Sequence, residues 1–232
     1  MFSVGLVTSY NRLLLVAAAL VLTAAGLIVW YGWLPHYRPA IEANESYGID
    51  VSHHQGDIDW ARVADDDITF AYIKATEGGD FVDTQFADNW EQAGANGVDR
   101  GAYHFFTLCR PGLEQAENFL RVMPSDLKAL PPAVDLELSG NCSQRPERAW
   151  VLEQLEAFLQ RVESATGQDA VLCLLDDFEQ TYRIRDAVER EHWERRILLR
   201  PTVKGWWMWQ VHARAAVDGI DGPADLNVMR GG

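Results

Sequence analysis

The most abrupt change in polarity along the chain comes near its start, where a long apolar run precedes a stretch of mixed composition. Leu13–Leu34 is almost wholly apolar, and Trp30, Tyr31 and Trp33 lie at its end. A helix of this length spans roughly 30 Å, the thickness of a bilayer's hydrocarbon core, and aromatic residues gather where that core meets the headgroups. We therefore expect residues 1–34 to be an uncleaved membrane anchor. A cleaved signal peptide is the alternative, but the run is long for one and lacks a clear cleavage site.

After a polar linker at residues 35–46, strand-like and helix-like patterns alternate. Apolar, β-branched and aromatic runs predict strands at 47–50, 70–75, 101–106, 133–138, 170–174, 196–199, 206–211 and 225–228. Apolar residues at helical spacing predict helices at 84–96, 113–122 and 146–166. This alternation indicates an α/β fold with a parallel core. Because residues 47–232 are fewer than the ~250 of a full (β/α)₈ barrel, we expect a modified, shortened TIM-like barrel with some outer helices reduced to loops.

The fourth predicted strand ends in two carboxylates, Asp135 and Glu137. Side chains alternate across a strand, so these two point to the same face. Two like charges on one buried face are costly unless something uses or compensates them. Glycoside cleavage uses such a pair, because one carboxyl group protonates the leaving oxygen and the other supports the developing positive charge. The alternative is a solvated strand end that carries two ordinary surface acids.

Other acidic residues lie at the ends of predicted strands. Asp50 ends the first strand, Glu77 follows the second, and Asp225 begins or precedes the last. In barrels of this class the chemistry collects at the C-terminal ends of the strands. We therefore expect these acids to meet Asp135 and Glu137 at one mouth of the barrel.

Charge and cysteine content restrict the possible partners and compartment. The formal net charge is −14, which argues against a nucleic-acid partner because such binding needs a basic surface. Cys109 and Cys142 each follow a predicted strand, so a disulfide between their loops is plausible. Cys173 lies within an apolar run and is expected to be a buried free thiol.

No metal or cofactor is expected. His53 and His54 adjoin Asp50, but no third histidine lies at ligand spacing, and neighbouring side chains diverge on an extended backbone.

Six short motifs in order resemble the family 25 glycoside hydrolases, the lysozymes of fungi, bacteria and phages. They lie at residues 47–56, 73–78, 101–106, 135–137, 209–210 and 225–227. The resemblance covers roughly residues 47–230 and implies cleavage of the β-1,4 bond between N-acetylmuramic acid and N-acetylglucosamine in peptidoglycan. It also implies that Glu137 is the general acid/base and that Asp50, Asp135 and Asp225 complete an acidic cluster.

Four further residues are candidates for binding the sugar. Tyr103 either stacks on a sugar ring or packs in the core, and Glu77 is either a substrate contact or a hydrogen-bonded strand cap. Trp209 offers an aromatic platform beside Gln210, although barrel strands also bury tryptophan. The sequence departs from the family pattern at residues 172–176 and at Val211-His212, two places that line the sugar groove in the family.

Two mechanisms remain open at this point. A carboxylate can attack the sugar directly, or the acetamido oxygen of the substrate can attack while Asp135 orients it, and we favour the second. Two other functions also remain open: a catalytically weak, membrane-anchored peptidoglycan-binding module and a chitinase-like glycosidase. A peptidoglycan substrate and a membrane anchor together predict a catalytic domain outside the cytoplasm.

Overall fold

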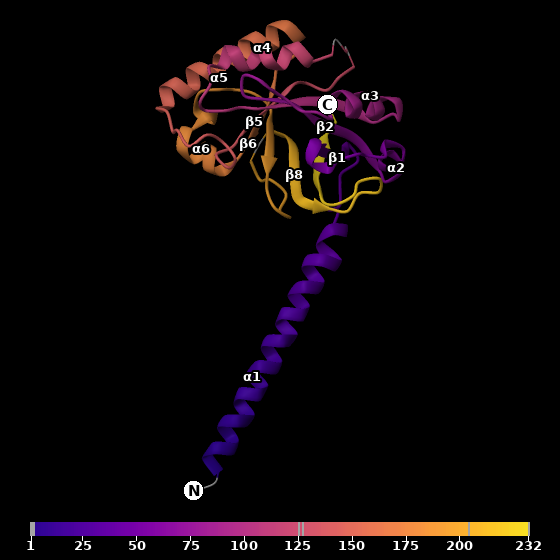
Figure 1. The fold of residues 1–232 in the computed structure, drawn as a ribbon, viewed down its shortest axis with the longest axis vertical. Helices are drawn as coiled ribbons and strands as arrows, with labels where there is room; N and C mark the ends of the chain where they lie inside the picture. Colours follow the sequence, from indigo (N-terminus) through magenta and orange to yellow (C-terminus); the bar gives the residue numbers. More distant parts are fainter. Residues whose placement is uncertain (1–2, 125, 127, 204, 232) are drawn as a thin grey trace. The chain divides into compact units, whose positions relative to one another are not determined.

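The computed structural model describes residues 3–124, 126, 128–203 and 205–231, with side chains from Arg12 onward. It divides into two compact units, residues 1–38 and 39–232. Figure 1 shows the first unit as a single long helix and the second as a barrel with helices packed around it.

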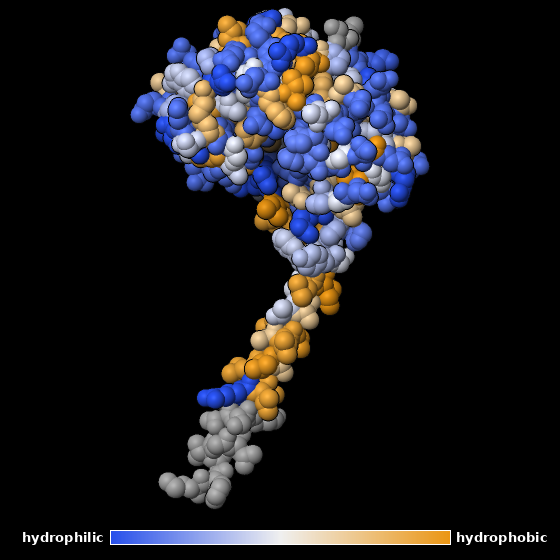
Figure 2. Space-filling view, viewed as in Figure 1, coloured by the Kyte–Doolittle hydropathy of each residue, from blue (hydrophilic) through white to orange (hydrophobic). Residues whose placement is uncertain are grey.

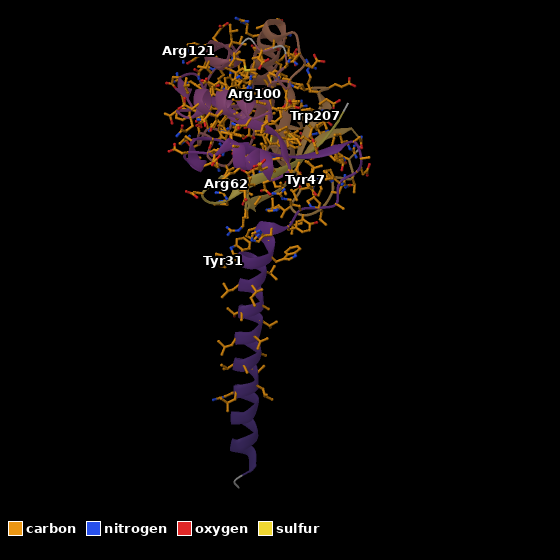
Figure 3. All side chains as sticks on the ribbon, turned by 90° about the vertical axis from the view of Figure 1, so that its right-hand side faces the viewer. Tyr31, Tyr47, Arg62, Arg100, Arg121 and Trp207 are labelled. Carbon is orange, nitrogen blue, oxygen red and sulfur yellow. A yellow bond between two sulfur atoms is a disulfide. The ribbon has the colours of Figure 1, made fainter. Side chains whose placement is uncertain are left out.

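The N-terminal helix begins with α1 (Ser3–Leu27) and continues through a π-helical turn, η1 (Ile28–Trp33), and a 3₁₀ turn, η2 (Leu34–His36). Residues 12–36 are long and apolar enough to cross a membrane. Leu22 is 72% exposed, and its neighbours form an almost continuous apolar surface (Figures 2 and 3). The predicted apolar helix is confirmed. A signal sequence near the N-terminus can pass the same test of length and composition, so the segment is either an anchor or a signal sequence.

Eight strands close the barrel of the second unit, in the order β1-β9-β8-β7-β6-β5-β4-β2, with β2 pairing back to β1. They are β1 (Glu45–Val51), β2 (Ile68–Glu77), β4 (Asp99–Phe105), β5 (Ala133–Leu136), β6 (Val171–Leu174), β7 (His192–Arg195), β8 (Trp206–Ala215) and β9 (Ala224–Arg230). A two-residue strand, β3 (Phe81–Val82), pairs with the end of β2. The predicted TIM-like barrel is therefore confirmed.

The helices lie in the connections between strands, as the alternating pattern predicted. They are α2 (Trp60–Asp65), α3 (Phe86–Ala95), α4 (Gly112–Val122), α5 (Arg148–Thr166) and α6 (Asp176–Tyr182), with 3₁₀ turns η3 (His53–Gln55) and η4 (Ile184–Asp186). The described residues of the β7–β8 and β8–β9 connections contain no helix, which accounts for the short domain. The strand β9 runs antiparallel to both of its neighbours, β1 and β8, and the connection that joins it to β8 is short.

The predicted position of the sixth strand was wrong. We expected a strand at residues 196–199, whereas β7 comprises residues 192–195. Ile197 and Leu199 are 66% and 74% exposed, while Trp193 is buried in the barrel. The strand β7 was not recognised because it contains charged residues and so lacks the apolar pattern of a buried strand. Its Glu194 is buried as an ion pair with Arg185 at 2.6 Å.

The interior of the barrel is filled with aromatic side chains below the candidate site. Tyr72 and Trp193 pack with their ring centroids 5.3 Å apart, and glycines on neighbouring strands make room for the rings. A Cβ atom at Gly101 would lie 2.4 Å from the Tyr72 ring, and one at Gly48 would lie 2.4 Å from the ring of Phe70. The filled interior confines any open space to the mouth of the barrel.

Candidate active site

A pocket of ≈ 390 Å³ opens at the ends of the strands and brings together acids from three distant parts of the chain. Its walls include Asp50 of β1, Asp225 of β9, Asp135 of β5, and Glu137, which follows β5. These four acids were predicted to converge here, and Glu77, which was expected at the same mouth, lines the pocket as well. The strand register explains one pair directly, because Asp50 lies opposite Asp225 where β1 pairs with β9.

Asp135 and Glu137 line the same pocket, as the alternation of side chains predicted. The strand β5 ends at Leu136, two residues before the end that we predicted, so Glu137 occupies the first position of the following loop. Oδ1 of Asp135 is buried and has no hydrogen-bond partner among the described residues. The Glu137 side chain is 20% exposed, which leaves it accessible from the pocket.

Burial is the main cause of a raised pKa at all four acids. It raises the pKa of Asp135 to about 8, with the Glu137 carboxylate adding to the effect. The pKa of Glu137 is also raised by burial, although the Arg195 guanidinium opposes this. Burial and the neighbouring Asp225 raise the pKa of Asp50 well above its ordinary value. Asp135 therefore retains its proton near neutral pH, and the raised pKa of Glu137 suits the role of a general acid.

Two hydrogen bonds limit these shifts at the β1–β9 side of the pocket. Nδ2 of Asn227 donates to Asp50 at 2.8 Å, and Nε2 of Gln210 donates to Asp225 at 2.6 Å. Each bond stabilises the ionised carboxylate and so lowers its pKa against the effect of burial. Both amides also fix the orientation of the carboxyl groups.

Two cations line the pocket among the acids. Nζ of Lys74 forms an ion pair with Glu77 at 2.7 Å and lies 5.0 Å from the centroid of the Phe105 ring. Nη1 of Arg195 lies 3.9 Å from Oε2 of Glu137. The first cation is already neutralised by its partner, whereas the second acts on the acids at longer range.

Three of the four residues predicted to bind the sugar line this pocket: Tyr103, Glu77 and Gln210. Trp209 does not line it. Its side chain is buried, and its indole Nε1 donates to the carbonyl oxygen of Arg196 at 2.6 Å. The aromatic wall of the pocket comes instead from Tyr103, Phe105 and Trp193.

Sequence reasoning missed Arg195, Trp193 and Cys173 as pocket residues. The first two were missed because β7 was placed four residues too late. Cys173 was correctly predicted as a buried free thiol, but its position opposite Asp135 in the β5–β6 register was not. Pairing the predicted strands residue by residue would have revealed that position.

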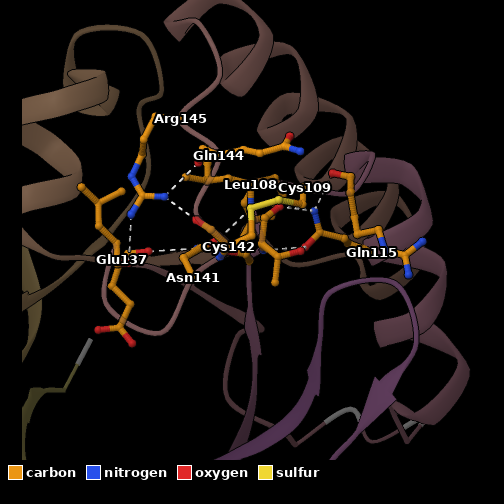
Figure 4. The surroundings of a disulfide bond; sticks show 12 residues. Leu108, Cys109, Gln115, Glu137, Asn141, Cys142, Gln144 and Arg145 are labelled. Carbon is orange, nitrogen blue, oxygen red and sulfur yellow. Dashed lines mark hydrogen bonds between the residues drawn. A yellow bond between two sulfur atoms is a disulfide. The ribbon is translucent and has the colours of Figure 1, made fainter.

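The predicted disulfide between Cys109 and Cys142 is present, with a Cα–Cα distance of 6.2 Å. It joins the loops that follow β4 and β5, beside Glu137 (Figure 4). Next to it, Nδ2 of Asn141 donates to the carbonyl oxygens of Phe106 at 2.8 Å and Glu137 at 3.0 Å. The bridge and this amide together fix the loop that carries Glu137.

The histidine pair beside Asp50 is arranged differently from our expectation. Residues 53–55 form the 3₁₀ turn η3, so the rings of His53 and His54 do not diverge but lie with their centroids 4.1 Å apart. Nδ1 of His53 pairs with Asp83 at 2.7 Å. Among the described residues, no group of three or more His, Cys, Asp and Glu side chains is arranged to bind a metal ion.

Comparison with known proteins finds a matching family model and relatives of similar sequence. The model of the family described as glycosyl hydrolases family 25 matches residues 49–220. The uncharacterized protein YegX of Escherichia coli K12 is 37% identical over 215 residues, which cover 88% of this chain and 78% of that protein. Lysozyme M1 of Streptomyces globisporus is 32% identical over 79% of this chain and 67% of its own length.

Among solved structures, a family 25 glycosyl hydrolase from Bacillus anthracis is similar in fold and sequence. It matches with a TM-score of 0.77 and 34% identity, and the match covers 85% of this chain and 94% of that one.

Proposed function

The chain belongs to the family 25 glycosyl hydrolases, and from this premise we propose that it is a peptidoglycan hydrolase that cleaves the β-1,4 bond between N-acetylmuramic acid and N-acetylglucosamine. Membership of this family makes the protein a glycoside hydrolase. The observation that carries the proposal is the convergence of Asp50, Asp135, Glu137 and Asp225 in one pocket at the strand ends. The lysozyme named among its relatives supports the substrate class.

We assign the role of general acid/base to Glu137. Its side chain is partly exposed to the pocket, and burial raises its pKa, which favours the protonated form that donates to the glycosidic oxygen as the bond breaks. After departure of the leaving sugar, the Glu137 carboxylate accepts a proton from the attacking water. The Asn141 hydrogen bond to its backbone oxygen keeps the residue positioned through both steps.

Asp135 acts on the acetamido group of the substrate in this proposal. Its carboxyl group accepts the acetamido N–H, which directs the acetamido oxygen toward the anomeric carbon, and its burial makes that hydrogen bond strong. Asp50 and Asp225 support the positive charge that develops on the sugar ring, at the β1–β9 side of the pocket. Direct attack by a carboxylate is the alternative, and it predicts a covalent glycosyl-enzyme that mass spectrometry of the intact protein would detect.

We also propose that the N-terminal helix anchors the enzyme in a membrane, with the catalytic domain outside the cytoplasm. Leu15 and Leu22, at 71% and 72% exposed, lie on a helix whose large apolar side chains from Leu13 to Trp33 are largely exposed. The Cys109–Cys142 disulfide supports an oxidising compartment, which is also where peptidoglycan lies.

Digestion of purified peptidoglycan, followed by mass spectrometry of the released muropeptides, tests the function. We expect fragments with N-acetylmuramic acid at the reducing end. Binding to cell walls without any fragment would favour the binding module, and release of sugars from chitin but not from peptidoglycan would favour the chitinase.

A further inference from the structure

A second pocket, of ≈ 450 Å³, adjoins the acidic pocket, and the two share Leu175 and Arg195 as wall residues. Its remaining walls come from the start of α6 and from the segment after β7: Asp176, Asp177, Arg196, Ile197 and Leu199. We refer to it as the side pocket. Because the two pockets meet at Arg195, a substituent on a sugar in the acidic pocket can extend past this residue into the side pocket.

At this junction the guanidinium N–H groups of Arg195 are available to donate hydrogen bonds to a ligand. Its guanidinium lies 3.9 Å from Glu137, beyond hydrogen-bond distance, and its side chain is 38% exposed. Within the described part of the chain it makes no side-chain hydrogen bond, whereas Lys74 is engaged by Glu77 at 2.7 Å. A guanidinium presents several N–H groups in one plane and so suits a planar carboxylate or carbonyl group.

The outer wall of the side pocket is apolar and fixed in place. Ile197 and Leu199 are 66% and 74% exposed, yet the backbone at residues 196 and 198 is hydrogen-bonded to β8. The Leu198 amide donates to the Val211 carbonyl at 2.9 Å, and the Arg196 carbonyl accepts from Trp209 at 2.6 Å. These bonds keep the two apolar side chains at the rim instead of letting them turn into the core.

We propose that Arg195 binds the carboxyl-derived oxygen of the lactyl group of N-acetylmuramic acid, and that the side pocket receives the peptide attached to that group in peptidoglycan. This inference rests on the proposed function. Because Arg195 lies beside Glu137 and lines both pockets, it can reach a substituent of the sugar whose glycosidic bond is cleaved. N-acetylglucosamine lacks the lactyl group, so Arg195 is the residue that selects muramic acid over it.

The acids of the pocket do not cancel the charge of Arg195. Burial raises the pKa of Asp135 to about 8, so this group retains its proton near neutral pH, and burial also raises the pKa of Asp225. In intact peptidoglycan the lactyl carbonyl is part of an amide and carries no charge. Its oxygen accepts hydrogen bonds from the guanidinium without repulsion from the remaining carboxylates.

The selectivity is tested with Arg195→Gln, by calorimetric titration with two disaccharides, one containing N-acetylmuramic acid and the other being chitobiose. This measurement does not depend on turnover. We expect the preference of the wild type for the muramic disaccharide to fall about 10–100-fold in the variant, as for loss of a hydrogen bond to a charged group. The control is Arg62→Gln, which removes an equal charge from an exposed pair with Asp218 at 3.5 Å and should preserve the preference.

The side pocket is tested with the double variant Ile197→Ser, Leu199→Ser on glycan strands with and without their peptides. We expect a larger loss of kcat/KM on the peptide-bearing strands, and Leu113→Ser, at an exposed site on α4, serves as control. An unchanged preference in Arg195→Gln, or equal losses on both strands in the double variant, would overturn the inference. If the wild type releases no muropeptides, the proposed function itself fails.

Discussion

Asn227 and Asp50 are joined by a hydrogen bond across the antiparallel seam of the barrel, with Nδ2 of the amide 2.8 Å from Oδ2 of the carboxyl group. Asn227 is fully buried, and its Oδ1 accepts from the indole Nε1 of Trp193 at 2.9 Å. An amide oxygen that accepts from an indole leaves the NH₂ group to face Asp50, so the indole determines which way the amide points. A residue of the last strand thereby orients an acid of the first.

Replacing Asn227 with Ala should affect both stability and the pH dependence of hydrolysis. The Trp193 indole loses its acceptor in the interior, which costs about 1–3 kcal/mol and lowers the midpoint of urea unfolding. The amide lowers the pKa of Asp50, so its removal should move the acidic limb of the pH–rate profile upward. The exposed Asn96→Ala variant loses only a hydrogen bond to Gln92 at 2.8 Å and is the control. An unchanged profile would show that the amide does not influence the site.

Glu137→Gln should reduce hydrolysis of peptidoglycan by roughly 10²–10⁴-fold, the contribution of a positioned general acid. Glutamine has nearly the same shape and cannot supply the proton, so the fold and the binding of glycan strands should persist. Turbidity loss of cell walls measures the rate, and circular dichroism checks the fold. Glu189→Gln, at an exposed position, should behave as wild type. Near-normal activity in Glu137→Gln would refute the assignment.

The sequence was sufficient to predict those features for which the local residue pattern and the chemistry of the side chains indicate the same structure. Asp135 and Glu137 follow a short apolar strand, so alternation alone places both on the pocket side. The Cys109–Cys142 bridge followed from the position of each cysteine just after a strand, since neighbouring strands place their following loops close together.

Features that depend on contacts made only in the folded protein could not be predicted from the sequence. The strand β7 is rich in charge because Arg185 neutralises Glu194 in the folded protein, and the run Ile197–Leu199 is apolar although its ends are exposed. Trp209 was expected at the sugar site but faces the backbone of residue 196. Helices α2 and α6 comprise six and seven residues, too few to show a helical period.

Asp135→Asn should stabilise the protein increasingly as the pH rises from about 4 to 8. Asp135 has a pKa of about 8 in the folded protein against an ordinary 3.8. Between these values the folded state holds a proton that the unfolded chain releases, so its contribution to stability falls with rising pH, by up to about 1.4 kcal/mol per unit. The amide variant has no such proton and escapes this loss, although we expect it to be inactive.

Urea unfolding of Asp135→Asn and wild type at pH 5 and pH 8 measures this effect as a difference between the two proteins. Taking the difference between the two proteins removes the contribution of His104, which is the same in both. Burial lowers the pKa of His104 to about 3, so its contribution to stability is lost as the pH falls below about 6.5. Asp88→Asn, at an exposed position, is the control. A stability gain that is equal at both pH values would contradict the raised pKa of Asp135.

The N-terminal helix should keep the full-length protein in the membrane pellet after a carbonate wash. The apolar segment covers 25 residues, Arg12–His36, or about 37 Å at 1.5 Å per residue. Leu20→Arg with Val21→Arg places two charges near its centre, each costing about 2.5–3.5 kcal/mol of insertion, and should move protein to the soluble fraction. A shortened soluble form of the wild type would identify the segment as a cleaved signal instead.

Removing the disulfide with Cys109→Ser and Cys142→Ser should lower both stability and activity. The bridge joins residues 33 positions apart, and closing such a loop typically contributes about 2–4 kcal/mol, so the thermal midpoint should fall. Activity should fall as well, because the bridged loop contains Asn141, whose amide donates to the backbone oxygen of Glu137 at 3.0 Å. Asn141→Ala, which keeps the bridge, separates the two effects: it should lose activity with a smaller loss of stability. Full activity in the double serine variant would show that the loop keeps its position without the bridge.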